Sequence, residues 1–213
     1  MTNPAPIRLT LPLTPEAARA LKVGDVVLLD GDAVATVGMP TQKRMVAEVE
    51  AGRELPLSLR DGSFFHMGVS YEDDDGRPGA VHYVNPTTSS RFNHLMPTLI
   101  RGLGLTATGG KGGLSQDSVD AMREVGCVYF SFVGGASALL SEGVEAVTDC
   151  AWRDLIMQFR LNRIRLNGFG PVIVAIDANG NSIYERLMTS ARERMPEIIR
   201  SLHSTEHDNE ADR

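Results

Sequence analysis

The alternation of strand-like and helix-like segments after residue 80 is the feature that most restricts the fold of this chain. Apolar runs at 81–84, 105–108 and 128–133 have the length of buried strands. Between them, residues 92–100 and 115–124 carry apolar side chains at helical spacing. Strands that alternate with helices pair in parallel, because each helix returns the chain to the same end of the sheet. We therefore predict an α/β fold with a mixed sheet core flanked by helices.

The residues before this region are richer in strand and turn signals. Residues 7–11 alternate like a strand, and Thr14 followed by Pro15 predicts the start of a short helix. Residues 26–29 and 33–37 predict two strands joined as a hairpin at the intervening Asp-Gly-Asp. Farther along the chain, the segment 72–79, which begins with four acidic residues, is expected to form a second, solvated hairpin loop.

The last part of the chain predicts one more strand and a long helix. Residues 170–177 read as a central strand closed by an Asn-Gly turn, and a helix is expected over 181–200. We expect residues 1–200 to form a single domain. The polar residues 201–213 are expected to be a disordered tail.

The composition excludes several classes of protein. At 213 residues and 42% hydrophobic content the chain can bury a core. Its 21 basic and 27 acidic residues give a net charge of -6, which argues against binding to nucleic acid or to an anionic membrane surface. The sequence shows neither a signal peptide nor a run of apolar residues that would span a bilayer, so we expect a soluble, cytoplasmic protein.

The two cysteines do not form a metal motif. Cys127 and Cys150 are 23 positions apart, with no CxxC pair and no nearby histidine pair. We expect buried thiols in a reducing compartment and no metal ligands from this chain, although a disulfide between the two stays open at this point.

Polar side chains gather at a turn that precedes a predicted helix, in residues 85–91. Four consecutive hydroxyls, from Thr87 to Ser90, are followed by Arg91. An N-cap accounts for one hydroxyl but not for four. A helix N-terminus with free N–H groups and an arginine could also bind a carboxylate or phosphate, and both roles can hold together.

A second turn places Lys111 among four glycines, in residues 109–113. The segment lacks the serine or threonine that follows the lysine in a phosphate-binding loop, so an ATPase is not predicted. Close approach of the backbone to a ligand and a flexible surface loop both remain open here. The glycines of 133–138 lack a complete dinucleotide motif, and we interpret them as packing residues.

The chain resembles the beta subunit, or C-terminal domain, of class I iron-sulfur fumarases and L(+)-tartrate dehydratases. The resemblance covers most of the sequence and is most specific at 86–91 and 110–113, with support from 23–26, 133–138 and 169–182. It implies a swivelling β/β/α domain that closes over a larger alpha partner. The cysteines of that partner hold a [4Fe-4S] cluster with one open iron, which acts as the Lewis acid.

The resemblance also implies roles for individual residues. Thr87 would be the catalytic residue that transfers a proton, and Arg91, Lys111, Thr88 and Gly112 would bind the substrate. A threonine hydroxyl is a weak base, so nearby cations would be needed to favour its deprotonated form.

One region departs from the family. The usual arginine position falls near Gly38 and the usual histidine near Gln42. A dicarboxylate would therefore lose one cationic contact, for which Lys43 or Arg44 could compensate.

We therefore expect the beta subunit of a heteromeric hydro-lyase acting on a small hydroxy-dicarboxylic acid, assembled with its alpha partner as a dimer or heterotetramer. The alternative is a non-catalytic dicarboxylate-binding module that has lost hydratase activity. A hydrolase based on Ser137 or Ser115 alone is disfavoured; Ser137 has no elbow motif around it and no assignable histidine partner.

Overall fold

The computed structural model describes the backbone of residues 5–74 and 77–211. The chain divides into two units, one ending at Asn181 and one beginning at Ser182. The first unit contains the sheet and five of the helices in the described part. The second is built on a single helix, α6 (Ile183–Ala211).

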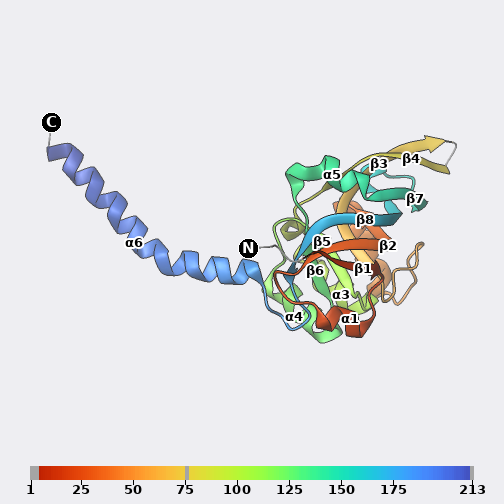
Figure 1. Cartoon of the computed structure of the whole chain (residues 1–213), viewed down its shortest axis with the longest axis horizontal. Helices are drawn as coiled ribbons and strands as arrows, with labels where there is room; N and C mark the ends of the chain where they lie inside the picture. Colours follow the sequence, from red (N-terminus) through yellow and green to blue (C-terminus); the bar gives the residue numbers. More distant parts are fainter. Residues whose placement is uncertain (1–4, 75–76, 212–213) are drawn as a thin grey trace. The chain divides into compact units, whose positions relative to one another are not determined.

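The described part of the first unit contains one sheet of eight strands in the order β1-β2-β3-β5-β6-β8-β7, with β4 paired to β3 (Figure 1). The pairing of β2 with β8 closes five of them, β2, β3, β5, β6 and β8, into a ring. The strands are β1 (Ile7–Leu11), β2 (Val26–Thr36), β3 (Ser63–Asp74), β4 (Arg77–Pro86), β5 (Ala107–Gly110), β6 (Val128–Ser131), β7 (Val144–Ala151) and β8 (Leu161–Ile176).

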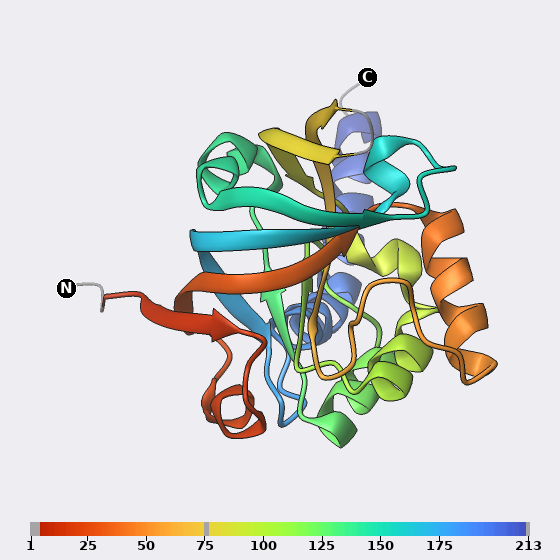
Figure 2. The same cartoon turned by 90° about the vertical axis from the view of Figure 1, so that its right-hand side faces the viewer.

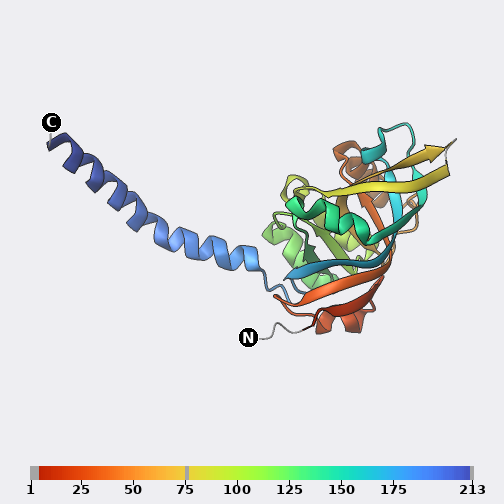
Figure 3. The same ribbon diagram turned by 45° about the horizontal axis from the view of Figure 1, so that its top comes forward.

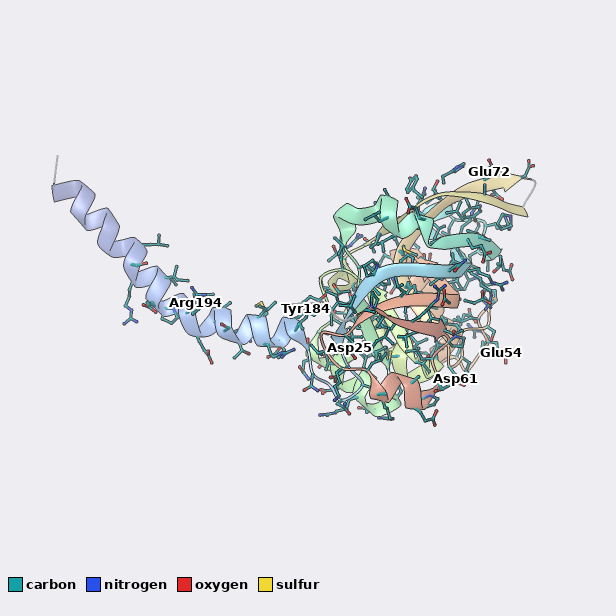
Figure 4. The ribbon with its side chains drawn as sticks, viewed as in Figure 1. Asp25, Glu54, Asp61, Glu72, Tyr184 and Arg194 are labelled. Atoms are coloured by element: carbon teal, nitrogen blue, oxygen red, sulfur yellow. The ribbon has the colours of Figure 1, made fainter. Side chains whose placement is uncertain are left out.

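Strand direction in the ring decides where polar loops can gather. The neighbours β2 and β3, β3 and β5, and β5 and β6 are parallel, so their carboxyl ends lie at the same end of the ring. Strand β8 runs antiparallel to β2, β6 and β7. The hairpin of β3 and β4 extends as a two-stranded arm, with Glu72 toward its free end (Figures 3 and 4).

Three helices gather on the same side of the ring (Figure 2). They are α2 (Met39–Glu50), α3 (Met96–Leu103) and α4 (Gln116–Val125), and α3 contacts both of the others. The shorter α1 (Pro15–Ala20) and α5 (Ser137–Glu142) are the other α-helices in the described part of this unit. The predicted mixed sheet core flanked by helices is therefore confirmed.

Successive side chains of β3 serve two different apolar layers, as the pleat of a strand requires. Phe65, Met67 and Val69 belong to the core cluster with residues of β2, β6 and β8. The alternate residue His66 points the other way and stacks on Phe92, with ring centroids 4.7 Å apart. All five of these side chains are fully buried, so both faces of β3 are covered.

The hairpin predicted for residues 26–37 is wrong, because β2 is one continuous strand. Gly31 stays paired with Leu11 of β1, and register shifts nearby mark it as an irregularity within the ladder. A Cβ at Gly31 would overlap the Leu11 carbonyl, so the glycine permits close approach of β1. Arg8 binds Asp30 through two hydrogen bonds, of 2.5 and 2.8 Å. The Asp-Gly-Asp signal therefore reflects tertiary contacts, not a turn.

Other boundaries also shift. Strand β8 begins at Leu161, before the predicted start. The strand predicted over 81–84 lies in β4, which pairs antiparallel with β3 where the alternation predicted parallel pairing. Most of the segment expected as an acidic loop is strand, and the remaining residues 75 and 76 lie outside the described part. The cap at Thr14 is confirmed, since its Oγ1 accepts from the Ala17 N–H at 3.1 Å.

Helix α6 continues to Ala211, past the predicted end of the helix at residue 200. The domain end at residue 200 and the disordered tail after it stay predictions. Within the described residues, no helix combines the length and the apolar character that crossing a bilayer requires. The cytoplasmic location also stays a prediction.

Candidate functional site

The two polar turns singled out in the sequence lie side by side. Thr88 and Lys111 form a parallel β-bridge outside the named strands. The Lys111 N–H donates to the Thr87 carbonyl at 3.0 Å, and the Ser89 N–H donates to the Lys111 carbonyl at 2.8 Å. Two segments more than twenty residues apart are thus joined by main-chain hydrogen bonds.

The joined segments lie at the carboxyl ends of parallel strands. β5 ends at Gly110, immediately before Lys111, and β6 ends at Ser131, which is paired with Gly110. Ligands commonly bind at the carboxyl ends of parallel strands, because the loops there carry polar groups that core packing does not use. The position agrees with a binding role for these turns.

The predicted helix N-terminus after Thr87 is not present in the expected form. Residues Ser89–Phe92 form a short 3-10 helix, and α3 begins only at Met96. The Thr87 N–H already donates to the His66 carbonyl at 2.9 Å, and the Ser89 N–H is used in the bridge. These two amides therefore hold the loop in place and are not free for an anion.

The side chains of the turn divide between surface and interior. Thr87 and Thr88 are partly exposed, Arg91 is exposed and Ser89 is fully buried. The guanidinium carbon of Arg91 lies 5.6 Å from the centre of the Phe92 ring, within range of a cation–π contact.

Arg91 and Lys111 have no carboxylate partner in the described part of the chain. Eight other arginines there form ion pairs with Asp or Glu: Arg8, Arg44, Arg53, Arg101, Arg123, Arg153, Arg160 and Arg165. The two cations of the candidate site are consequently not neutralised by a protein group and are available to an anionic ligand.

The glycines around Lys111 are structural, and the flexible-loop interpretation fails for the first two. Gly109 and Gly110 are buried in β5. Gly112 has φ +79°, and a Cβ there would lie 3.3 Å from the Thr88 Cγ2. Gly112 therefore lets the two turns approach each other.

A third segment joins the site that sequence reasoning did not assign to it. A Cβ at Gly134 would lie 3.1 Å from both Cδ and Nζ of Lys111. The glycine does pack closely, as interpreted, but against the lysine stem. The pairing of β5 with β6 brings these residues together, and that pairing could not be read from the Gly-Gly motif alone.

Three buried polar side chains lie beneath the bridge. His66 Nδ1 and Ser89 Oγ are 2.8 Å apart, and Ser89 Oγ and Tyr129 Oη are also 2.8 Å apart. All three residues are fully buried. Burial lowers the pKa of His66 from its ordinary 6.5 to about 3, so the imidazole is neutral at physiological pH.

The two positions at which the chain departs from the family pattern, Gly38 and Gln42, carry no cation. Gly38 precedes α2, and a Cβ there would overlap the Thr41 Oγ1 and lie 2.9 Å from the Phe159 Cβ. Gln42 is fully buried, and neither of its amide atoms has a hydrogen-bond partner in the described structure. Of the two lysine and arginine candidates nearby, Lys43 is exposed and Arg44 pairs with Asp154.

The described residues do not suit a metal or cluster. They contain no group of three His, Cys, Asp or Glu side chains that could hold a metal ion. Cys127 and Cys150 are both buried and unpaired, and burial raises the pKa of the Cys127 thiol.

A cavity of about 350 Å³ lies elsewhere, lined by the end of α2 and residues that follow it, and contains none of the predicted site residues.

Comparison with known proteins identifies the family. Residues 2–187 match the family model described as fumarase C-terminus. The chain belongs to this family.

Individual proteins that are similar to this chain carry names consistent with the fumarase C-terminus family. A Methanocaldococcus jannaschii protein named "Putative L(+)-tartrate dehydratase subunit beta" is 31% identical over 188 residues, 88% of this chain and 95% of that protein. The L(+)-tartrate dehydratase subunit beta of Escherichia coli K12 is 28% identical over 194 residues, 91% of this chain and 94% of that protein. A Geobacillus stearothermophilus protein named "Putative fumarate hydratase class I" is 29% identical, but the match covers only 36% of its length.

Proposed function

We propose that this chain is the beta subunit of a hydro-lyase that adds or removes water on a small hydroxy-dicarboxylic acid. The observation that carries the proposal is the bridge between Thr88 and Lys111, which joins the turn that carries Thr87 and Arg91 to the turn that carries Lys111. Neither cation has a carboxylate partner among the described residues. The names of the relatives in the fumarase C-terminus family support the same reaction class.

In this proposal Thr87 is the group that moves the proton. Removal of water from a hydroxy acid takes a proton from the carbon next to one carboxylate, while the C–O bond at the neighbouring carbon breaks. The Thr87 carbonyl accepts the Lys111 N–H, and the Thr87 side chain is partly exposed. In this proposal the Lys111 ammonium or the Arg91 guanidinium lies near the Thr87 hydroxyl when the substrate is bound. A cation nearby favours the deprotonated hydroxyl, which is the form that accepts a proton.

Arg91 and Lys111 bind the substrate carboxylate in this proposal, with Thr88 and Gly112 lining the same bridge. Negative charge spreads from the deprotonated carbon into the adjacent carboxylate during the reaction. Fixed positive groups that are already in place stabilise that charge without reorganising. The carbon acid is therefore easier to deprotonate beside these two side chains.

The remaining parts of the site are assigned to a partner. We propose an alpha subunit that holds a [4Fe-4S] cluster, over which this domain closes, in a cytoplasmic dimer or heterotetramer. The described residues of this chain do not fit a cluster, and none of the steps assigned to them uses one. Because Gly38 offers no cation, we also assign the contact with the second carboxylate to the partner.

Reconstitution tests the proposal. The chain would be produced anaerobically with the candidate alpha subunit, and fumarate hydration and L(+)-tartrate dehydration would be measured for the pair and for each subunit alone. Activity that requires both subunits is expected. If the pair dehydrates or hydrates neither acid nor related hydroxy-dicarboxylates, the enzyme proposal fails. Tight binding of a dicarboxylate by the chain alone would then favour the non-catalytic module.

Variants assign the roles within the pair. Thr87→Ala should lower kcat at least a hundredfold with little change in KM, whereas Thr87→Ser, which keeps a hydroxyl, should retain most of the activity. Arg91→Ala and Lys111→Ala should also raise KM, because each removes a contact to the carboxylate. An unchanged kcat for Thr87→Ala would remove the proton-transfer role from this residue.

A further inference from the structure

The buried hydroxyl of Ser89 joins two strands across a third. His66 is on β3 and Tyr129 is on β6, and β5 lies between these strands. A Cβ at Gly110 of β5 would overlap the Ser89 Oγ and lie 3.0 Å from the His66 Cβ. The missing side chain at Gly110 therefore leaves the space in which Ser89 reaches both neighbours.

The donors and acceptors in the hydrogen bonds among His66, Ser89 and Tyr129 can be assigned from the protonation of His66. His66 is neutral and carries one N–H, and its Nε2 has no partner in the described structure. A buried N–H without a partner costs more than an unpaired lone pair, so the proton belongs on Nδ1. Nδ1 then donates to the Ser89 Oγ, and the Ser89 hydroxyl donates to the Tyr129 Oη.

Ser89 also touches both halves of the candidate site through its backbone. It is two residues from Thr87, and its N–H donates to the Lys111 carbonyl at 2.8 Å. His66 contributes at a second point, because its carbonyl accepts the Thr87 N–H at 2.9 Å. The same few residues thus fix the side chain beneath the bridge and the main chain of the bridge itself.

We propose that Ser89 is a positioning residue, whose hydroxyl, held between His66 and Tyr129, sets the placement of Thr87 and Lys111 for the reaction. The proposal rests on the proposed function. Ser89 is fully buried, so it acts through the loop that carries Thr87 and not by contact with the substrate. A displacement of about 1 Å in a reacting group can lower a rate about a hundredfold, so small movements of this loop matter.

The kinetic test uses the complex with the alpha subunit. Ser89→Ala should lower kcat ten- to a hundredfold while KM changes less than threefold. The matched control is Tyr71→Phe, which also removes a buried hydroxyl with hydrogen-bond partners, among them Cys150 Sγ at 3.2 Å and Asn162 Oδ1 at 3.0 Å, but outside the site. The control should lose comparable thermal stability and keep its kcat. Equal loss of kcat in both variants would mean that Ser89 contributes only to general stability, which overturns the proposal.

If Ser89→Ala folds poorly, Tyr129→Phe alone still tests the proposal, because an unchanged kcat in that variant would contradict it; where both variants fold, they form a double-mutant cycle. Tyr129→Phe removes one bond of Ser89 and should lower kcat less than Ser89→Ala does. The double variant should be no slower than Ser89→Ala alone, because the hydroxyl that both changes affect is already gone. Effects that multiply independently would show that Ser89 does not act through Tyr129, and would contradict the proposal.

Nuclear magnetic resonance of the chain separates this proposal from the proposed function. In the unmodified chain we expect a neutral His66 protonated at Nδ1 and slow amide exchange at Thr87, Ser89 and Lys111. Ser89→Ala should alter the His66 nitrogen shifts and speed exchange at these three amides, while Tyr71→Phe should leave both unchanged. If the spectra respond as expected but the complex never shows dehydratase activity, only the proposed function fails. If exchange at the three amides does not change, the positioning role fails.

Discussion

The buried imidazole of His66 predicts a specific loss of stability between pH 7 and pH 5. Burial lowers its pKa to about 3 in the folded chain, against 6.5 for an ordinary histidine. Between these two pKa values the imidazole is protonated in the unfolded chain and neutral in the folded chain. Stability from this group is fully present above pH 6.5 and is lost progressively as the pH falls toward 3. Between pH 7 and pH 5 the loss is about 2 kcal/mol, from a histidine with these two values.

Carboxylates contribute in a different pH range. Arginine partners lower the pKa of Asp30, Asp73, Glu124 and Asp154 below the ordinary 3.8 of Asp and 4.5 of Glu, so protonation of these groups weakens the fold only when the pH falls below those ordinary values. Their effect is small above pH 5. The interval from pH 7 to pH 5 therefore reports mainly on histidine.

Urea unfolding of the chain and of His66→Asn at the two pH values measures the effect. Asparagine presents a polar atom near the position of Nδ1, so it keeps a hydrogen bond to Ser89 Oγ but does not titrate. Fluorescence of Trp152, the single tryptophan, follows unfolding of the first unit. The unmodified chain should lose about 2 kcal/mol more than His66→Asn between the two pH values. Identical losses would show that His66 is not buried as a neutral group.

Two further predictions concern Gln42, a buried amide without a hydrogen-bond partner, and Gly134, which packs against the Lys111 side chain. Gln42→Leu should raise the free energy of unfolding by about 1–2 kcal/mol, because it removes two buried amide atoms that lack hydrogen bonds; urea unfolding measures this, and a loss of stability would indicate that the amide is bonded in solution. Gly134→Ala should raise KM in the complex by displacing the Lys111 stem, while Gly135→Ala, whose Cβ meets nothing within 4 Å, should not; equal kinetics would show that Lys111 does not depend on this space.

The sequence predicted secondary structure correctly where that structure depends on residues close together in the chain. The cap at Thr14 is decided within a few residues and is present, and the stripe predicted over 92–100 lies in α3 from Met96 onward. The hairpin turn predicted at the Asp-Gly-Asp segment around Gly31 was wrong for the opposite reason, because the conformation of this segment depends on Arg8, which is distant in sequence. A turn signal in the sequence cannot report such a partner.

The candidate site shows the same division. Hydroxyls and cations in the two turns were visible as unusual composition, and the structure joins those turns at Thr88 and Lys111. Gly134 and the buried group around Ser89 were not visible, because they enter the site only through the pairing of β5 with its neighbours. Strand order is a property of the whole ring, so single motifs do not carry it.

A structure of the chain in complex with its alpha subunit and a bound dicarboxylate tests the central claim most directly. We predict one substrate carboxylate bound by Arg91 and Lys111, with the Thr87 hydroxyl facing the carbon next to that carboxylate. A dicarboxylate bound in the complex away from these three side chains would contradict the account.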